Sequence, residues 1–403
     1  MTRILMLGGA GQMGQSAAQI LAAAPAVDRL VVTDLSARRA ADFAKTLGPK
    51  ASGIGLDVTD ELALRAALAD CDLVLNTVGP YFRFGEPILA ATIAAGRNYI
   101  DICDDWEPTL AMLAMDEKAR AAGIYALVGM GSSPGVANML AVSAARELDT
   151  VDSIVTAWSA EDARTAVSDD GTPSAAFVHG MHQISGSIRV VRDGVHVDRP
   201  ALERIRIDYP GIGRGVAWSF GHPEAVTLDR AFPELRGNTN AIVADNLFIG
   251  VCHLLRWAVG AKLFTVDRAA AVAHRIVPLL PASGLIKPGA LPPLFAVATG
   301  LKGGEKATVA TALAQAPGAG MAENTGVPLA VAALLLADRT DAKPGVHTPE
   351  TLLDPKDFFA GFAPYCIGNP PPDAMTATTR SWATPEENRE SLRVSLLTAF
   401  FAA

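Results

Sequence analysis

The chain has 403 residues, of which 50% are hydrophobic and 19% charged, so it is long enough for two or three globular domains and too apolar to be disordered. Its 34 basic and 42 acidic residues leave a net charge of −8, which argues against a broad nucleic-acid-binding surface. We therefore expect no nucleic-acid partner.

Hydropathy and cysteine content bear on where the protein resides. The longest uninterrupted apolar run is Leu329–Ala337, about half of what a bilayer requires. The 4 cysteines are widely separated and form no Cys-x-x-Cys pair, so neither a disulfide scaffold nor a cysteine-based zinc site is expected. The sequence predicts a cytoplasmic protein without membrane association.

Residues 1–130 alternate short β-rich runs with Ala/Leu-rich helical patterns. We expect strands at Arg3–Leu7, Leu30–Thr33, Gly53–Leu56, Leu73–Asn76, Tyr99–Ile102 and Tyr125–Val128. We expect helices at Gln12–Ala23, Ala37–Leu47, Asp60–Ala69, Pro87–Ala95 and Pro108–Ala122. Apolar strands without alternation are typical of a parallel sheet buried on both faces, so the pattern predicts a doubly wound α/β domain.

A different pattern begins at the turn-rich segment Gly131–Gly135. After a helix at Val136–Glu147, the chain favours antiparallel strands, with hairpins expected at Asp193-Gly194 and Gly303-Gly304. The segment Thr325–Pro328 is expected to open an apolar helix at Leu329–Ala337. The proline-rich run at Asn369–Pro372 is expected to end the compact fold and start a polar tail.

A dinucleotide fingerprint, G-x-G-x-x-G, follows the first strand and opens the first helix. Its glycines suit a tight turn, the close approach of a pyrophosphate and close helix–strand packing, and Asp34 ends the second strand 20 residues after Gly14. The predicted cofactor-binding residues here are Gly9, Ala10, Gly11, Gln12, Met13, Gly14 and Asp34.

The choice of cofactor depends on Asp34. Its carboxylate can accept hydrogen bonds from both ribose hydroxyls of NAD and would repel a 2′-phosphate, so NAD is favoured. Arg38 and Arg39 lie just downstream and could neutralise that phosphate, which keeps NADP possible. The loop after the fourth strand also lies at the ligand-binding edge of such a sheet, which adds Asn76, Thr77, Gly79 and Pro80 to the predicted cofactor contacts.

The residues that follow the tyrosines exclude one common class of dehydrogenase. None of the 5 tyrosines has a lysine four positions later, which excludes the usual Tyr-x-x-x-Lys proton donor of short-chain dehydrogenases and sugar epimerases.

Several motifs together resemble the saccharopine dehydrogenase-like oxidoreductases, over about residues 3 to 360. They are the segments 8–14, 76–81, 99–105, 133–135, 323–328 and 345–350. The resemblance implies a Rossmann domain at 1–130, an inserted α/β substrate and dimerisation domain at 131–322, a helix and closing segment at 323–360 that return to the first domain, and a tail at 361–403. It also implies a homodimer.

Members of this family, such as saccharopine reductase, lysine 6-dehydrogenase and carboxynorspermidine dehydrogenase, interconvert an amine-bearing carbon and an imine by hydride transfer. The chain departs from saccharopine reductases at Ser133, where they tend to carry an aspartate, so saccharopine itself is not the expected substrate. The resemblance places substrate contacts within 209–240.

Three residues are the candidates for proton transfer or amine binding. Asp104 belongs to an acidic cluster after the fifth strand, with Asp101 and Asp105, in which like-charge repulsion could raise one pKa. Tyr81 could hydrogen-bond the substrate, and His222 lies in a Gly-His-Pro-Glu turn. Each has a structural alternative: an acidic helix cap, a partly buried aromatic and a backbone-bonded loop histidine.

A metal site is not expected. His179 and His182 have a spacing seen in metal sites, but no third ligand is identifiable nearby. The leading hypothesis is an NAD(P)-dependent oxidoreductase acting at a C–N bond of an amino-acid-like small molecule. The alternatives are an NADP-linked reductase that joins an aldehyde and an amine, and a redox sensor that binds NAD(H) without turnover.

Overall fold

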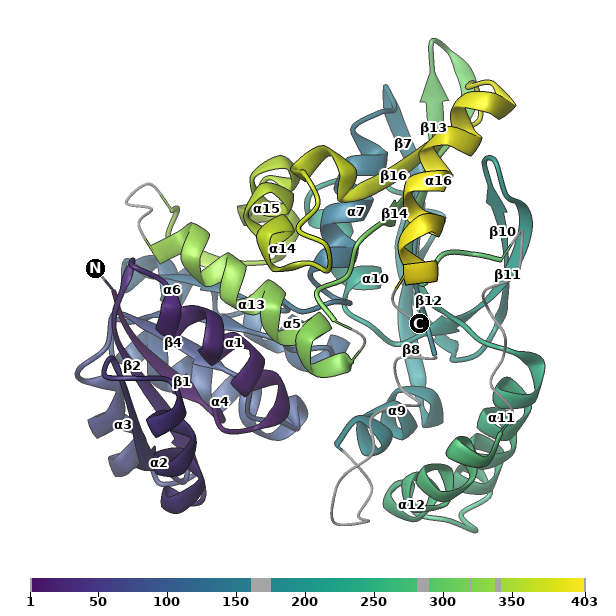
Figure 1. The fold of residues 1–403 in the computed structure, drawn as a ribbon. Coiled ribbons are helices and arrows are strands. Elements are labelled where there is room, and N and C mark those ends of the chain that lie inside the picture. Colours follow the sequence, from purple (N-terminus) through teal and green to yellow (C-terminus); the bar gives the residue numbers. More distant parts are fainter. Residues whose placement is uncertain (1, 161–174, 281–289, 319, 338–341, 402–403) are drawn as a thin grey trace. The chain divides into compact units, whose positions relative to one another are not determined.

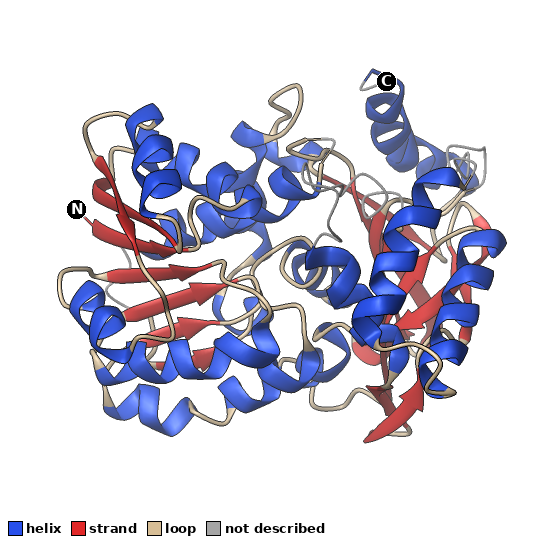
Figure 2. Cartoon of the chain, turned by 90° about the horizontal axis from the view of Figure 1, so that it is seen from below, coloured by secondary structure: helices blue, strands red, loops and turns tan. Residues whose placement is uncertain are grey.

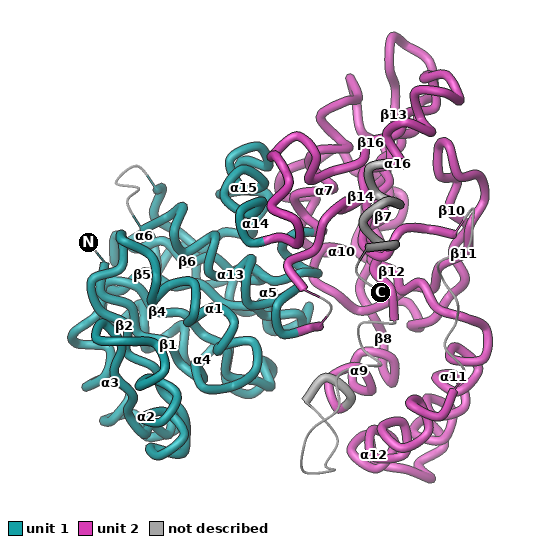
Figure 3. The backbone as a smooth tube through the Cα atoms, in the orientation of Figure 1, with its two compact units in different colours: residues 1–136, 322–365 teal, residues 137–321, 366–403 magenta. Residues whose placement is uncertain are grey.

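The chain forms two compact units in the computed structural model, which describes residues 2–160, 175–280, 290–318, 320–337 and 342–401. The first unit comprises residues 1–136 and 322–365, and the second comprises residues 137–321 and 366–403 (Figure 3). Each unit therefore takes segments from two distant parts of the chain.

The first unit is built on a seven-stranded sheet, all of whose paired strands are parallel, in the order β15-β6-β5-β4-β1-β2-β3. Its strands are β1 (Thr2–Leu7), β2 (Val27–Asp34), β3 (Ala51–Gly55), β4 (Leu73–Asn76), β5 (Asn98–Asp101), β6 (Tyr125–Leu127) and β15 (Gly345–His347). Figure 2 shows helices on both sides of this sheet. The predicted doubly wound α/β fold is confirmed.

The helices of this unit are α1 (Gln12–Ala23), α2 (Ala37–Thr46), α3 (Glu61–Leu68), α4 (Tyr81–Ala94), α5 (Trp106–Leu113), α6 (Asp116–Ala121), α13 (Met321–Ala337), α14 (Pro349–Leu352) and α15 (Pro355–Phe362). Helices α1 to α6 lie in the connections between its strands, α13 precedes β15, and α14 and α15 follow it. Two predictions are wrong in detail: α4 begins six residues before Pro87, and the helix expected at Pro108–Ala122 is divided into α5 and α6. Pro87 lies inside α4.

One face of the parallel sheet packs against α3, α4 and α5. Leu5 and Leu7 of β1, Val74 of β4 and Tyr99 of β5 are buried in one apolar cluster with side chains of these helices. This burial explains why the strands contain apolar residues without alternation, since the opposite face is covered as well.

The seventh strand, β15, joins the sheet from a remote part of the chain. It pairs in parallel with β6, and the Val346 N–H donates to the Asp116 carboxylate at 2.9 Å. The sequence predicted six strands and missed β15, whose partner β6 is remote in the sequence.

Helix α13 packs against α1 within the first unit (Figure 1). A Cβ at Gly326 would lie 2.3 Å from the Met13 carbonyl oxygen and 2.8 Å from Ser16 Cβ, so only glycine permits this approach. The helix begins at Met321 rather than at the predicted Leu329. Gly326 and Pro328, interpreted as a helix-opening turn, lie inside the helix, where tertiary packing outweighs their low helix propensity.

We expect Gly326→Ala to lower the unfolding free energy by about 1–3 kcal/mol, because the added methyl group meets backbone that cannot move independently. The matched control is Gly250→Ala on α11 (Asn246–Gly260), where a Cβ meets no described atom within 4 Å and alanine favours the helix by about 1 kcal/mol. Chemical denaturation followed by circular dichroism measures both variants. Equal stability of the two variants would contradict the close packing of α13 on α1.

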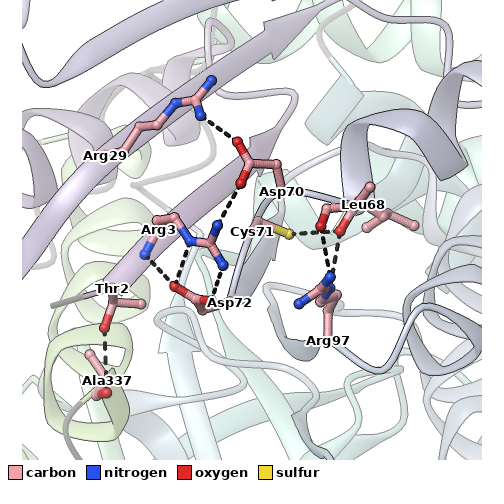
Figure 4. A network of polar contacts seen from close by, with 10 residues as sticks. Thr2, Arg3, Arg29, Leu68, Asp70, Cys71, Asp72, Arg97 and Ala337 are labelled. Carbon is pink, nitrogen blue, oxygen red and sulfur yellow. Dashed lines mark hydrogen bonds and ion pairs between the residues drawn. The ribbon is translucent and has the colours of Figure 1, made fainter.

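Arginines join the amino ends of β1 and β2 to the turn before β4 (Figure 4). Arg3 donates from its backbone N–H and from its guanidinium to Asp72, the latter at 2.7 Å from Nη2, and both Arg3 and Arg29 pair with Asp70. The hydrogen bonds from Arg3 lower the pKa of Asp72. This network lies at the end of the strands opposite to Asp34 and Asn76, so it serves the sheet rather than a ligand.

The second unit is built on a mixed nine-stranded sheet in the order β10-β11-β12-β7-β13-β14-β16, with β8 and β9 beside β12. Only β12 and β7 pair in parallel among these described strands. The strands are β7 (Thr150–Ser159), β8 (Ser187–Arg192), β9 (Val195–Pro200), β10 (Arg204–Tyr209), β11 (Gly213–Phe220), β12 (Gly237–Val243), β13 (Leu294–Lys302), β14 (Glu305–Leu313) and β16 (Thr376–Arg380). The helices are α7 (Val136–Ala145), α9 (Ala175–Ser185), α10 (Glu224–Thr227), α11, α12 (Val266–Ile276) and α16 (Pro385–Phe401).

Both hairpins predicted for this unit are confirmed. Asp193 and Gly194 connect β8 to β9 with φ values of 50° and 80°, and Gly303 and Gly304 connect β13 to β14 with φ values of 59° and 84°. Such left-handed pairs match the twist of a two-residue hairpin.

The polar tail expected after Asn369 is not a tail. β16 pairs with β14 at the edge of the mixed sheet, and α16 follows it. The Arg380 guanidinium makes a two-pronged ion pair with Glu147, at 2.6 and 3.0 Å. The strand was missed because its partner lies more than 60 residues away in the sequence. None of the described helices combines the length and apolarity needed to cross a bilayer.

Candidate functional site

The glycine fingerprint forms a tight turn between β1 and α1. Gly8 has a φ of +70°, and its carbonyl oxygen accepts a hydrogen bond from the Gly11 N–H at 2.9 Å. The left-handed residue of this turn is Gly8, one position before the fingerprint begins. Gly9 instead allows close packing against β1, because a Cβ at this position would lie 2.9 Å from Met6 Cγ. At Gly14 a Cβ would lie 2.7 Å from the Gly8 carbonyl oxygen, so this glycine lets the helix pack on the turn as expected.

Helix α1 presents an amino terminus without a side-chain cap. Its N-cap is Gly11, and its first turn contains no acidic residue. Helices α2 and α3 differ, because Ser36 caps α2 and Asp60 caps α3 by accepting backbone N–H groups, whereas α4 also lacks a side-chain cap. The first-turn N–H groups of a helix have no intrahelical acceptor, and together with the helix dipole they attract an anion. Gln12, Met13 and Gly14 therefore fit a pyrophosphate.

Asp34 lies at the end of β2, where its side chain is 12% exposed. One carboxylate oxygen accepts the Ser36 N–H at 2.8 Å, and the other lies 3.5 Å from a guanidinium nitrogen of Arg39. Arg39 also donates to the Ala10 carbonyl oxygen at 3.2 Å, so it links Asp34 to the glycine turn. Arg38 instead points to Asp42 and is 91% exposed.

The loop after β4 lies beside the glycine turn. A Cβ at Gly8 would come within 3.1 Å of Thr77 Oγ1, and the Thr77 hydroxyl donates to the Leu7 carbonyl oxygen at 2.9 Å. Asn76 is buried and shapes the loop: its amide donates to the Tyr99 hydroxyl, and its oxygen accepts the Val78 N–H. Gly79 is exposed and Pro80 half-buried. Contacts from this loop to a cofactor stay a prediction.

Tyr81 is buried, and its hydroxyl donates to the Asn76 carbonyl oxygen at 2.7 Å. Burial raises the pKa of this phenol well above its ordinary value. The geometry favours the structural alternative, in which Tyr81 holds the start of α4 against β4, and its role toward a substrate stays a prediction.

The three aspartates after β5 have different surroundings. Asp101 is fully buried and accepts three hydrogen bonds, from the Tyr99 hydroxyl at 2.8 Å, the Cys103 N–H at 3.0 Å and the Gly129 N–H at 2.8 Å. Burial raises its pKa to about 6, and repulsion from Asp104 is the smallest contribution. The sequence predicted that like-charge repulsion would raise one pKa in this cluster. The pKa of Asp101 is raised, but burial is the main cause. Asp105 is buried at the N-cap position of α5 but makes no side-chain capping hydrogen bond, and Asp104 is half-buried.

His222 lies in an aromatic cluster of the second unit. Its ring is 6% exposed and stacks on Trp158 with centroids 5.2 Å apart, and the ring of Phe220 meets it edge-on at 5.1 Å. His179 of α9 lies on another side, with ring centroids 6.4 Å apart. A histidine held between aromatic rings has a fixed orientation, which is a requirement for proton transfer.

Glu224, two residues after His222, was not assigned a role from the sequence. Its side chain is fully buried, and its carboxylate accepts the Asn240 amide at 3.2 Å. The same amide donates to the Thr156 hydroxyl at 3.0 Å, and the Trp158 indole donates to the Asn240 oxygen at 3.3 Å. The sequence shows Glu224 as a carboxylate in a turn beside apolar residues. Such a pattern does not reveal whether the carboxylate is buried, so Glu224 could not be singled out.

Comparison with known proteins identifies the nucleotide-binding part of the chain. Residues 4–127 match the family model described as saccharopine dehydrogenase NADP binding domain. In structure, the chain is similar to apo saccharopine dehydrogenase (L-Glu forming) from Saccharomyces cerevisiae, with a TM-score of 0.57 and 18% identity over 89% of this chain and 96% of the yeast chain.

Two relatives differ in how much of this chain they match. Carboxyaminopropylagmatine dehydrogenase of Synechocystis sp. is 25% identical over 88% of this chain and 94% of its own length. Trans-acting enoyl reductase of Mycobacterium tuberculosis is 35% identical over 102 residues, so this chain spans about a quarter of that relative (24%).

The resemblance predicted from the sequence motifs is thereby confirmed. Residues 4–127 match the saccharopine dehydrogenase NADP-binding domain, and the fold of the chain is similar to that of saccharopine dehydrogenase.

Proposed function

We propose that the protein is an NAD(P)-dependent oxidoreductase that transfers a hydride at a C–N bond of an amino-acid-derived substrate. The observation that carries this proposal is the uncapped amino terminus of α1 behind the glycine turn, with Asp34 at the end of the next strand, inside a domain of NADP-binding type. A bound nicotinamide dinucleotide supplies the hydride chemistry.

The full-length relative supports the C–N bond as the reacting bond. Carboxyaminopropylagmatine dehydrogenase aligns over nearly its whole length, and its name denotes an amine-bearing substrate. The enoyl reductases share only about 100 residues with this chain, so they give no support for a substrate with a C=C bond.

The chain's own residues would have two tasks in such a reaction. Oxidation removes a hydride from the carbon and a proton from the nitrogen, so a base must lie near the amine, and the reverse reaction returns both. His222 and Asp104 are the proposed proton carriers. Glu224, a buried carboxylate held by Asn240, is a candidate to hold an ammonium group.

The proposal is tested by incubating the purified protein with NAD or NADP and a panel of amino acids, N-carboxyalkyl amino acids and polyamines, while nicotinamide absorbance is recorded. The reverse direction uses NADH or NADPH with amine and aldehyde pairs. We expect turnover with at least one amine-bearing substrate. Asp34→Ala should reduce the NAD-dependent rate at a limiting NAD concentration and leave an NADP-dependent rate nearly unchanged, and a reaction without protein serves as the blank.

The alternatives give different results in the same assay. Activity only with NADPH and an aldehyde–amine pair would favour a condensing reductase. Tight nucleotide binding without turnover across the panel would favour a redox sensor and would contradict the proposed oxidoreductase. A homodimer and NAD as the preferred cofactor remain part of the proposal, and light scattering tests the first.

A further inference from the structure

A cavity of about 510 Å³ lies entirely within the second unit, on the mixed sheet, and small-molecule sites commonly have this size. Its lining comes from six strands of this sheet and the turn before β10. Val155 of β7, Thr239 of β12 and Ser219 of β11 contribute from the middle of the sheet, and Arg192 of β8, Arg199 of β9 and Arg204 of β10 contribute positive charge.

The lining contains three guanidinium groups and one carboxylate, Glu203. This local excess of positive charge contrasts with the net charge of −8 of the whole chain. Glu203 holds two of the three arginines: Arg199 reaches both of its carboxylate oxygens, at 2.5 and 3.3 Å, and Arg192 reaches one at 2.8 Å. The guanidinium groups of Arg192 and Arg199 are thus oriented in advance.

Further hydrogen-bond donors are available at the cavity. The Ser219 hydroxyl accepts the Glu203 N–H at 2.9 Å, which leaves its own proton to donate, and Thr239 adds a second hydroxyl. Arg204 is exposed and has no acceptor among the described residues. The cavity therefore offers more donors than acceptors.

A purely structural interpretation would treat Glu203 as a bridge between the β8–β9 hairpin and β10. That bridge uses Arg192 and Arg199, but it needs neither Arg204 nor an open cavity. Arginine is well suited to bidentate recognition of carboxylates and phosphates, and three such groups around one cavity exceed what one carboxylate can pair.

We propose that this cavity binds a small oxyanion with at least two charged groups, either a polycarboxylate or a phosphate. Glu203 occupies the guanidinium groups of Arg192 and Arg199 until such a ligand competes for them. The site belongs to the second unit alone, whereas the nucleotide-binding residues belong to the first, so the inference is independent of the proposed function.

The test is isothermal titration of the full-length protein with citrate and with pyrophosphate, at constant ionic strength set by sodium chloride. We expect saturable binding, weakened at least about tenfold by Arg204→Ala. We expect Glu203→Gln to tighten binding by about three- to tenfold, because it removes the competing charge. Arg206→Ala, on the same strand but outside the cavity, is the matched control and should stay within about twofold.

The anion that binds more tightly gives the chemical class of the natural ligand, and binding of either supports the site. Three results would overturn it: no saturable binding of either anion, equal weakening by Arg206→Ala and Arg204→Ala, or weaker binding to a folded Glu203→Gln variant. The last result is the one that a merely structural ion-pair network predicts. Circular dichroism establishes folding, and because Arg204 is exposed, its variant is testable even if Glu203→Gln does not fold.

Discussion

Asp34→Ala is expected to weaken NADH binding by about 30- to 100-fold, with a change in NADPH binding of less than about threefold. The carboxylate would accept hydrogen bonds from two ribose hydroxyls, and losing bonds to a charged acceptor costs about 2–3 kcal/mol in total. NADPH lacks one of these hydroxyls, and its 2′-phosphate would be repelled by the carboxylate, so removal of the charge offsets the lost bond.

Arg39 provides a second test of the preference between NADH and NADPH. It lies 3.5 Å from Asp34 and donates to the Ala10 carbonyl oxygen, so it lies where a 2′-phosphate would be neutralised. We expect Arg39→Ala to weaken NADPH binding more than NADH binding. Arg38→Ala is the matched control, because Arg38 is on the same helix but pairs with Asp42 and faces solvent.

The measurement is fluorescence titration of each variant with NADH and NADPH at one ionic strength, since both ligands are anions. Tighter binding of NADPH than of NADH to the unaltered protein, together with no effect of Asp34→Ala, would overturn the preference for NAD. If Gly326→Ala bound neither NADH nor NADPH while the other variants still did, the result would instead indicate a displaced α1.

The elements that could be predicted from the sequence are those with local signals. Helix α1 matches its predicted bounds, and the hairpins at Gly194 and Gly303-Gly304 follow from their turn residues. Strands β15 and β16 could not be predicted, because each is defined by pairing with a strand far away in the sequence rather than by its own composition. The same holds for the start of α13, which depends on packing against Met13.

The candidate site shows the same limit. The fingerprint located the glycine turn and Asp34, because backbone geometry dictates those residue types at those positions. The burial of individual side chains could not be predicted from the sequence. Asp101 and Asp104 belong to the same acidic cluster, yet Asp101 is fully buried in a hydrogen-bond network and Asp104 is half-buried. Glu224 was missed for this reason as well.

Asp101→Ala is expected to lower the unfolding free energy by at least about 3 kcal/mol. It would leave three buried donors without an acceptor, the Tyr99 hydroxyl and the N–H groups of Cys103 and Gly129, at about 1–3 kcal/mol each. The Gly129 bond joins the ends of β5 and β6, so the loss also loosens the edge of the sheet where the nucleotide site lies. Asp70→Asn, in the exposed network at the opposite end, is the control and should cost less than about 1 kcal/mol.

Asp101→Asn adds a test of ionisation, because its amide has nearly the same shape but no charge. The folded pKa of Asp101, about 6, lies above the ordinary value of 3.8, so the folded state binds the proton more tightly than the unfolded state does. The contribution of Asp101 to stability is therefore present at low pH and is lost as the pH rises through about 6. We expect the unaltered protein to lose about 1 kcal/mol relative to Asp101→Asn between about pH 5 and pH 7.5, measured by urea unfolding at each pH. If the difference in unfolding free energy between the unaltered protein and Asp101→Asn stays constant or grows with pH, the prediction is wrong. The three hydrogen bonds would then lower the pKa of Asp101 more than burial raises it, and the carboxylate would stay ionised.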